Sequence, residues 1–221
     1  APHCAVDVQA LGADFLVSSA YKWFGPHQGV LWGREEILED TFAYRVRPAG
    51  DELPHKFETG TLSHEGMAGC LGAIDYLTDM GTRLTSDAAR AALSAEGKSA
   101  RTAAIHAGLE AMTAYEHGLT RRLIDGLTSF KGLTIRGITS ANAMHRRVPT
   151  VSFTMEGVRP EHIARAMADN NIFVWSGHNY AVEAVTHMGL MDKGGVLRVG
   201  LAHYNTEAEV DAFLETLGRV V

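Results

Sequence analysis

Several patterns that would define a class of protein are missing from this 221-residue sequence. Cys4 and Cys70 are its only cysteines, too few for a disulfide framework, so a reducing cytoplasm is the expected location. No apolar run approaches the roughly 20 residues of a membrane span, and no charged and then apolar leader opens the sequence. The sequence therefore predicts a cytoplasmic protein with no part in the membrane.

Charge and motif spacing exclude further classes. The formal net charge is -6 with acids and bases interspersed, which provides no field for attracting nucleic-acid phosphates. No Cys-x-x-Cys pair, His-Glu-x-x-His or Gly-x-Ser-x-Gly motif occurs, and the 11 histidines are scattered. We therefore expect neither nucleic acid nor a metal ion as a ligand.

What is present is an ordinary globular composition, with 46% hydrophobic and 21% charged residues. The length allows one large domain or two unequal ones. The sequence begins with Ala1 rather than Met and runs directly into structured-looking sequence. A parallel sheet that started with a strand at residues 15–18 would be short of neighbours within the chain, so we expect further N-terminal sequence in the intact protein.

One lysine has unusual surroundings. Lys22 follows an apolar run at residues 14–18 that breaks into hydroxyls, and a Gly/Pro turn comes next. The other lysines occupy polar or Gly-flanked segments that are typical of solvated surface, namely Lys56, Lys98, Lys131 and Lys193. An amine at the mouth of a sheet is placed to form an imine with a carbonyl compound; the alternative is a lysine that extends from a strand end to water.

The first part of the chain reads as mixed α/β. Two strands of the buried type are expected at residues 14–18 and 29–33, followed by a short helix at 35–40 and a polar loop at 45–57. A helix with apolar positions at Met67, Cys70, Leu71, Ile74 and Leu77 follows the segment 57–63. Backbone N–H groups at that helix start would suit an anion, and a Thr/Ser cap is the alternative.

The second part predicts a small α/β domain of three or four strands with helices on one face. Residues 82–97 are weakly helical, and the apolar spacing over 101–130 predicts one long helix that could bridge two domains. Strands are expected at 133–136, 148–155, 172–175 and 196–201, and helices at 160–169 and 207–217. Thr206 is expected to cap the last helix, with Glu209 at capping-box spacing.

Three separated segments together resemble the class V aminotransferase family of fold-type I pyridoxal-phosphate enzymes, in its cysteine-desulfurase-like branch. They are Ser-Ala-Tyr-Lys-Trp-Phe-Gly-Pro-His at 19–27, Phe-Glu-Thr-Gly-Thr at 57–61 and Arg-Val-Gly-Leu-Ala-His-Tyr-Asn-Thr at 198–206. The resemblance runs from Val6 to Val221 and implies the C-terminal portion of such an enzyme. It implies the end of the large cofactor-binding domain at 1–100, a linking helix at 101–130 and a small α/β C-terminal domain at 131–221.

The resemblance also implies roles. Lys22 would form the imine with pyridoxal 5'-phosphate, and Ser19 would contact the cofactor phosphate, with Tyr21 where related enzymes often carry a phosphate-binding histidine. Gly60 and Thr61 would reach the phosphate of the neighbouring subunit, which implies a homodimer. The residues that would contact the amino-acid substrate are Arg198, for the α-carboxylate, and His178, Asn179 and Tyr180. The alternative for Arg198 is an ordinary strand-end ion pair.

One departure bears on the reaction. Desulfurases of this group carry a loop resembling Arg-Ser-Gly-His-His-Cys-Ala, and here the stretch is Trp-Ser-Gly-His-Asn-Tyr-Ala at 175–181. Tyr180 stands at the position of the nucleophilic cysteine, and a phenol cannot take up sulfane sulfur as a thiolate does. Cys4 and Cys70 are expected to be structural. The resemblance therefore implies lyase, transaminase or racemase chemistry on a small amino acid rather than persulfide-forming desulfuration.

Related enzymes also carry an aspartate for the pyridine nitrogen, a phosphate turn and a ring-stacking side chain ahead of the position of Ala1. Without these groups we expect the isolated chain to be inactive or nearly so. A second hypothesis is a degenerate, non-catalytic homologue or C-terminal interaction domain that uses the same scaffold for protein contact.

Overall fold

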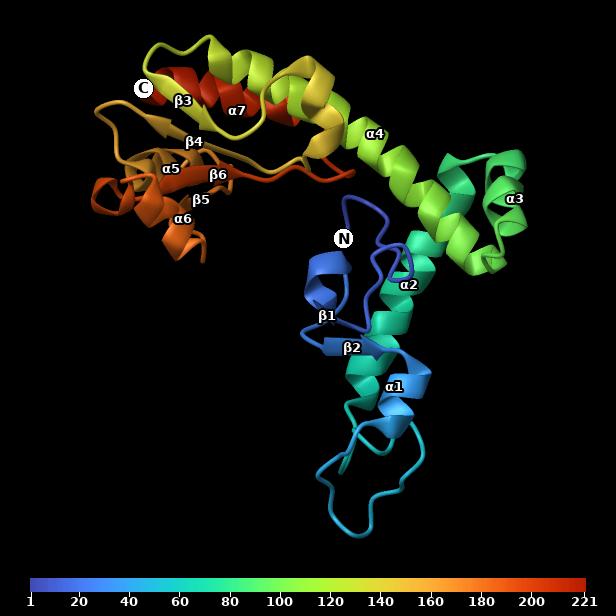
Figure 1. Cartoon of the computed structure of the whole chain (residues 1–221). Helices are drawn as coiled ribbons and strands as arrows, with labels where there is room; N and C mark the ends of the chain where they lie inside the picture. The colour runs from blue at the N-terminus through green and yellow to red at the C-terminus, as the bar shows by residue number, and fades with distance from the viewer. The chain divides into compact units, whose positions relative to one another are not determined.

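The computed structural model describes residues 1–221, and the chain divides into two compact units. Unit 1 comprises Ala1–Ala111 and unit 2 comprises Met112–Val221. The boundary falls inside the long helix α4, Ala100–Thr128, which is drawn in green in Figure 1. The expected long helix is thus confirmed, and it contributes residues to both units.

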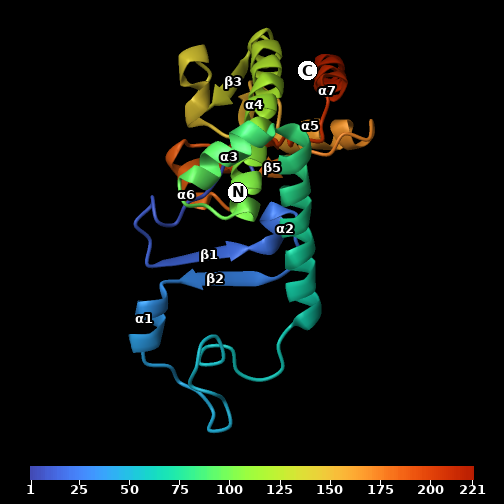
Figure 2. The same cartoon turned by 90° about the vertical axis from the view of Figure 1, so that its right-hand side faces the viewer.

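Unit 1 begins with a two-stranded hairpin. Strands β1, Phe15–Ser19, and β2, Gly29–Gly33, pair antiparallel, as the two adjacent arrows in Figure 2 show. Both strands were expected within one residue of these bounds, but their pairing is antiparallel because a parallel crossover needs about a dozen residues and only residues 20–28 connect them. The expectation that they are buried is wrong: Val17 is 77% exposed.

The rest of unit 1 is helical. After the hairpin come α1, Glu35–Asp40, a loop, α2, His64–Leu84, and α3, Asp87–Ala95. Helices α2 and α4 cross closely at two glycines: a Cβ added to Gly81 would lie 1.9 Å from the carbonyl oxygen of Ala104. On the other side of the crossing, a Cβ added to Gly108 would lie 2.7 Å from the Cα of Gly81.

The loop before α2 contains a lysine that differs from the expectation. Lys56 was predicted to lie on solvated surface, yet it is 9% exposed. Its Nζ donates to the carbonyl oxygens of Leu38 at 3.0 Å and Glu39 at 2.6 Å, which belong to the last turn of α1. The buried charge is therefore offset by carbonyl groups that the end of a helix leaves without partners.

Unit 2 contains a four-stranded antiparallel sheet in the order β3-β4-β6-β5. The strands are β3, Leu133–Arg136; β4, Val151–Met155; β5, Trp175–Gly177; and β6, Val196–Val199. Three of the four predicted strands are confirmed, with shorter bounds for β4 and β6. The strand predicted at 172–175 is displaced, because pairing with β6 begins only at Trp175, opposite Arg198.

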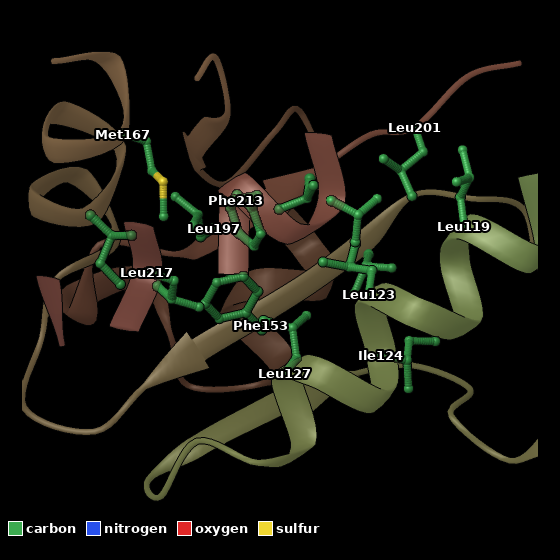
Figure 3. Close-up of a cluster of buried hydrophobic side chains, with 14 of the residues drawn as sticks. Leu119, Leu123, Ile124, Leu127, Phe153, Met167, Leu197, Leu201, Phe213 and Leu217 are labelled. Carbon is green, nitrogen blue, oxygen red and sulfur yellow. The ribbon is translucent and has the colours of Figure 1, made fainter. Parts of the chain in front are cut away.

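Helices cover both faces of this sheet rather than one. The main core joins α4, α5 (Pro160–Ala168) and α7 (Glu207–Val220) to the alternating residues Val151 and Phe153 of β4, as Figure 3 shows for Phe153. On β6, Leu197 belongs to this core, whereas the adjacent Val196 packs with α6, Val182–His187. Neighbouring strand residues point to opposite faces, so α6 lies on the second face.

Short 3-10 segments and one cap complete the description. The segments are η1, Ala20–Trp23; η2, Ala141–Arg146; and η3, Met191–Lys193. The predicted capping box of α7 is confirmed, since the Thr206 hydroxyl accepts from the Glu209 N–H and the Glu209 carboxylate accepts from the Thr206 N–H. The backbone N–H of Thr206, then the side chain of Asn205, lower the pKa of Glu209 from its ordinary value. No helix of the chain has the length and apolarity to cross a membrane.

Candidate functional site

The lysine turn of unit 1 is held by its backbone. Ala20 is fully buried, and its N–H donates to the carbonyl of Gln28 at 2.8 Å while its carbonyl accepts from Gly25 N–H at 2.9 Å. A Cβ on Gly25 would lie 2.9 Å from the Cβ of Ala20, so only glycine allows this close return of the chain. The turn therefore fixes the start of η1, the segment that carries Lys22.

The structure places Lys22 on the surface of unit 1, with an exposed side chain. Its Nζ lies 5.6 Å from the centre of the Tyr21 ring, which in turn lies 5.1 Å from the His27 ring. The two rings lie beside Lys22 but do not enclose it, and its side chain stays exposed. Unlike Lys56 and Lys98, which bind carbonyls and carboxylates, Lys22 forms no hydrogen bond or ion pair.

The other predicted cofactor contacts in unit 1 fall into two groups. Ser19 ends β1 next to the lysine turn and is half-buried, and Tyr21 is beside Lys22 on η1. Gly60 and Thr61 lie in an exposed loop, where Gly60 adopts a left-handed φ of 82° that favours glycine. Thr61 lines a cavity of about 810 Å³ whose other walls are mostly apolar, including Cys70.

In unit 2 the strand register aligns four side chains across one face of the sheet. Arg136 on β3 pairs with Ser152 on β4, Ser152 pairs with Arg198 on β6, and Arg198 pairs with Trp175 on β5. Directly paired residues of antiparallel strands project to the same face. The row Arg136–Ser152–Arg198–Trp175 therefore lies on the face opposite the main core, and we call it the arginine row.

A cavity of about 490 Å³ opens on this face and brings together Arg198 and the predicted substrate residues His178 and Asn179. Arg136 and Ser152 of the arginine row also line it, and no Asp or Glu does. Arg198 forms no ion pair or hydrogen bond within the chain, so the strand-end ion pair considered as its alternative is absent. Its guanidinium remains available to an anion from outside the chain.

The loop between β5 and α6 shapes one wall of this cavity. Gly177 has a φ of 112°, and Asn179 and Tyr180 adopt left-handed φ values of 51° and 63° that are uncommon for residues other than glycine. Asn179 Nδ2 donates to the Gly177 carbonyl at 3.0 Å, and the Tyr180 N–H donates to His178 Nδ1 at 3.2 Å. Tyr180 itself is 93% exposed and does not line the cavity, so the structure separates it from the other three substrate residues.

The structure thus assembles two groups of predicted residues and adds two that sequence reasoning missed. Ser19, Tyr21 and Lys22 are adjacent in unit 1, and Arg198, His178 and Asn179 share the cavity of unit 2. Arg136 and Ser152 were missed because only strand register brings them beside Arg198. No group of three or more His, Cys, Asp or Glu side chains is arranged to hold a metal ion. Cys4 is exposed and Cys70 is buried, and neither forms a disulfide.

Comparison with known proteins defines the class. The fold matches solved cysteine desulfurases: the apo enzyme from Thermococcus onnurineus NA1 superposes with a TM-score of 0.72 at 26% identity, covering 100% of this chain and 50% of that one. A cysteine desulfurase from Escherichia coli, 23% identical with a TM-score of 0.71, has the same fold. The mixed α/β chain therefore has the fold of about half of a cysteine desulfurase, which agrees with the fold class that the sequence predicted.

The family follows from sequence matches along the chain. Residues 1–100 and 90–213 match the family model for aminotransferase class-V, and the chain belongs to that family. A probable cysteine desulfurase of Streptomyces coelicolor is 30% identical over 235 residues, and an aminotransferase-like protein of Gibberella zeae is 32% identical over 225 residues. Both alignments cover 100% of this chain but 48% and 49% of those proteins, so the chain spans about half the length of these relatives.

Proposed function

We propose that the intact protein is a pyridoxal 5'-phosphate enzyme that acts on a small amino acid, with Lys22 as the residue that links to the cofactor. The observation that carries the proposal is the Lys22 amine, which forms no hydrogen bond or ion pair and lies on η1, directly after strand β1, in a chain of the aminotransferase class-V family. Members of this family use pyridoxal 5'-phosphate. Its aldehyde reacts with amines, and its ring withdraws electrons from a bond that breaks at the substrate α-carbon.

The residues present fit this group. The Lys22 amine carries no competing hydrogen bond, which leaves it able to form a covalent link, and Ser19 offers a hydroxyl donor beside it for a phosphate oxygen. Once free of that link, the same amine can hold or move a proton at the substrate α-carbon. Gly60 and Thr61 lie in an exposed loop, and we propose that they reach the phosphate of a second subunit in a homodimer.

Substrate positioning is assigned to unit 2. Arg198 has a planar guanidinium without an internal partner, which suits a bidentate pair with an α-carboxylate. Such a pair orients the substrate and so selects which bond at the α-carbon reacts. His178 and Asn179 line the same cavity and are placed to contact the rest of the substrate.

The reaction class we propose is that of a lyase, transaminase or racemase. Tyr180 is exposed and replaces the cysteine that accepts sulfur in related desulfurases. The cysteines that the chain does contain are a buried Cys70 on α2 and an exposed Cys4 near the first residue. Neither is in the loop that follows β5, so the chain offers no thiolate at the position where persulfide would form.

The experiment that tests this proposal uses the intact protein incubated with pyridoxal 5'-phosphate. We expect a visible absorbance band of the lysine adduct, which borohydride fixes permanently, and a mass increase on the peptide that contains Lys22. The Lys22→Ala variant should lose both signals, whereas Lys131→Ala, at an exposed turn, should keep them. A cofactor adduct on another lysine, or no adduct at all, would contradict the proposal and favour a non-catalytic homologue.

A further inference from the structure

Arg136 is the residue of the arginine row that the proposed roles leave unexplained. Its Nη2 donates to Thr154 Oγ1 at 2.8 Å, but its Nε is buried and has no hydrogen-bond partner. A buried guanidinium N–H without an acceptor costs free energy, since it has given up its bonds to water. A ligand that supplies an acceptor would remove this cost.

A second buried polar atom in the same cavity also lacks a partner. Asn179 Oδ1 forms no hydrogen bond, although Asn179 Nδ2 is held by the Gly177 carbonyl. Arg136 and Asn179 are the only residues of the chain with such atoms, and both line the cavity that contains Arg198. Buried polar atoms without partners need a hydrogen-bond partner from outside the chain, which a polar ligand or an ordered water supplies.

Charge points to what that ligand carries. Arg136 and Arg198 are two strand spacings apart, about 10 Å between Cα atoms, with the small Ser152 between them. No carboxylate lines the cavity, and neither guanidinium forms an ion pair, although the chain as a whole has a net charge of -6. The two guanidinium groups repel each other, and an anion bound between them offsets this repulsion. The pair therefore suits a ligand with two acidic groups.

Arg136 has no ion-pair partner on its other side either. Arg136 also lines a neighbouring cavity of about 650 Å³, together with Glu156 and Asp192. Neither of them forms an ion pair with Arg136. Its only partner there is the neutral hydroxyl of Thr154.

We propose that Arg136 is a specificity-determining residue that binds a second acidic group on the side chain of the substrate, so that the enzyme prefers acidic amino acids to their neutral amides. Arg198 holds the α-carboxylate and Arg136 the side-chain carboxylate or a similar anion. Asn179 Oδ1 accepts a hydrogen bond from the same ligand. This inference rests on the proposed function, because it takes Arg198 as the α-carboxylate site.

The test measures equilibrium binding of aspartate, glutamate, asparagine and glutamine to the intact protein by calorimetry. The unmodified protein should bind each acid at least about tenfold more tightly than its amide. In the Arg136→Gln variant the affinity for the two acids should fall by about tenfold or more, and the affinity for the two amides should change by less than about twofold. Equal affinity for acids and amides in the unmodified protein would overturn the inference.

Three further variants separate binding from folding and from general charge. Arg165→Gln removes one positive charge from an exposed position on α5 that does not line the cavity, and it should leave the preference unchanged. Thr154→Val removes the hydrogen bond to Arg136 but keeps its guanidinium, so the preference should persist. Arg136→Lys keeps the charge without the fork and should restore part of the affinity for acids. If Arg165→Gln lowers the affinity for the acids as much as Arg136→Gln does, the inference is wrong.

The failure of this inference and the failure of the proposed function can be told apart. Each sample is also examined for the lysine adduct with pyridoxal 5'-phosphate. An adduct with no preference for acids would overturn only the role of Arg136. A preference for acids that depends on Arg136, found without any adduct, would overturn the proposed function and would leave Arg136 as a residue that binds acidic ligands.

Discussion

The burial of Lys56 could not be predicted from its neighbours in the sequence, because its hydrogen-bond partners are far away along the chain. This lysine lies in a loop with polar neighbours such as His55 and Glu58, yet its ammonium is buried against the carbonyl groups of Leu38 and Glu39. The two partners are 17 and 18 residues away along the chain. The lysine therefore fastens the loop before α2 to the end of α1.

Replacing this lysine should destabilise unit 1. Lys56→Met keeps most of the apolar stem but removes the donors, so we expect the free energy of unfolding to fall by about 2 kcal/mol, the range for hydrogen bonds to a charged group. Urea titration of the chain, followed by circular dichroism, measures the change. Lys131→Met at an exposed turn should shift it by less than about 0.5 kcal/mol. Equal effects of the two substitutions would show that the carbonyl contacts of Lys56 contribute no stability.

At the scale of single elements, two glycines allow the backbones of α2 and α4 to approach closely where the helices cross. Gly81 and Gly108 face each other within unit 1, and no room remains for a methyl group on either. Glycine weakens a helix by about 1 kcal/mol relative to alanine, so its presence at this contact reflects close approach of the two backbones.

A pair of substitutions on one helix tests this point. Gly81→Ala would place a methyl group against the backbone of Ala104, and we expect a loss of about 1–3 kcal/mol in the free energy of unfolding. Gly72→Ala on the same helix meets no atom within 4 Å and should raise stability by up to about 1 kcal/mol. Thermal unfolding of both variants gives the comparison. A Gly81→Ala variant as stable as Gly72→Ala would mean that the helices can separate without cost.

At the scale of the whole molecule, the two units differ in how they bury apolar surface. The main core of unit 2 joins three helices to β4 and β6, with Phe153 fully buried. The hairpin of unit 1 instead exposes large apolar side chains, Val17 and Leu31 among them. Local stability follows buried apolar contact, so the hairpin of unit 1 should open more readily than the sheet of unit 2.

Hydrogen exchange should reveal this difference. In the 221-residue chain, amides of β4 and β6 should exchange at least about tenfold more slowly than those of β1 and β2. Mass spectrometry of peptic peptides measures both sets in one experiment, and α7 peptides, which pack on the same core, serve as an internal reference. Equal protection of the hairpin and the central sheet would contradict the division into units of unequal stability.

Much of the element order could be predicted from local patterns. The long helix, the capping box of α7 and three of the four strands of unit 2 depend on periodicity and on contacts within a few residues, which a sequence displays directly. The six-residue helix α6 and the true start of β5 were missed. Val185 gives α6 a single buried residue, and β5 is defined by its pairing with Arg198.

The sequence by itself determined the family, because the lysine turn, the Phe-Glu-Thr-Gly-Thr loop and the segment around Arg198 are local strings whose order identifies aminotransferase class-V. It also supplied Lys22 and Arg198 as candidates for the chemistry. Only the tertiary structure decided that Arg136 lies in the same row as Arg198, and that Lys56 rather than Lys22 is the buried lysine of the chain. Strand register and burial arise from contacts between residues far apart in the sequence, and no local pattern encodes them.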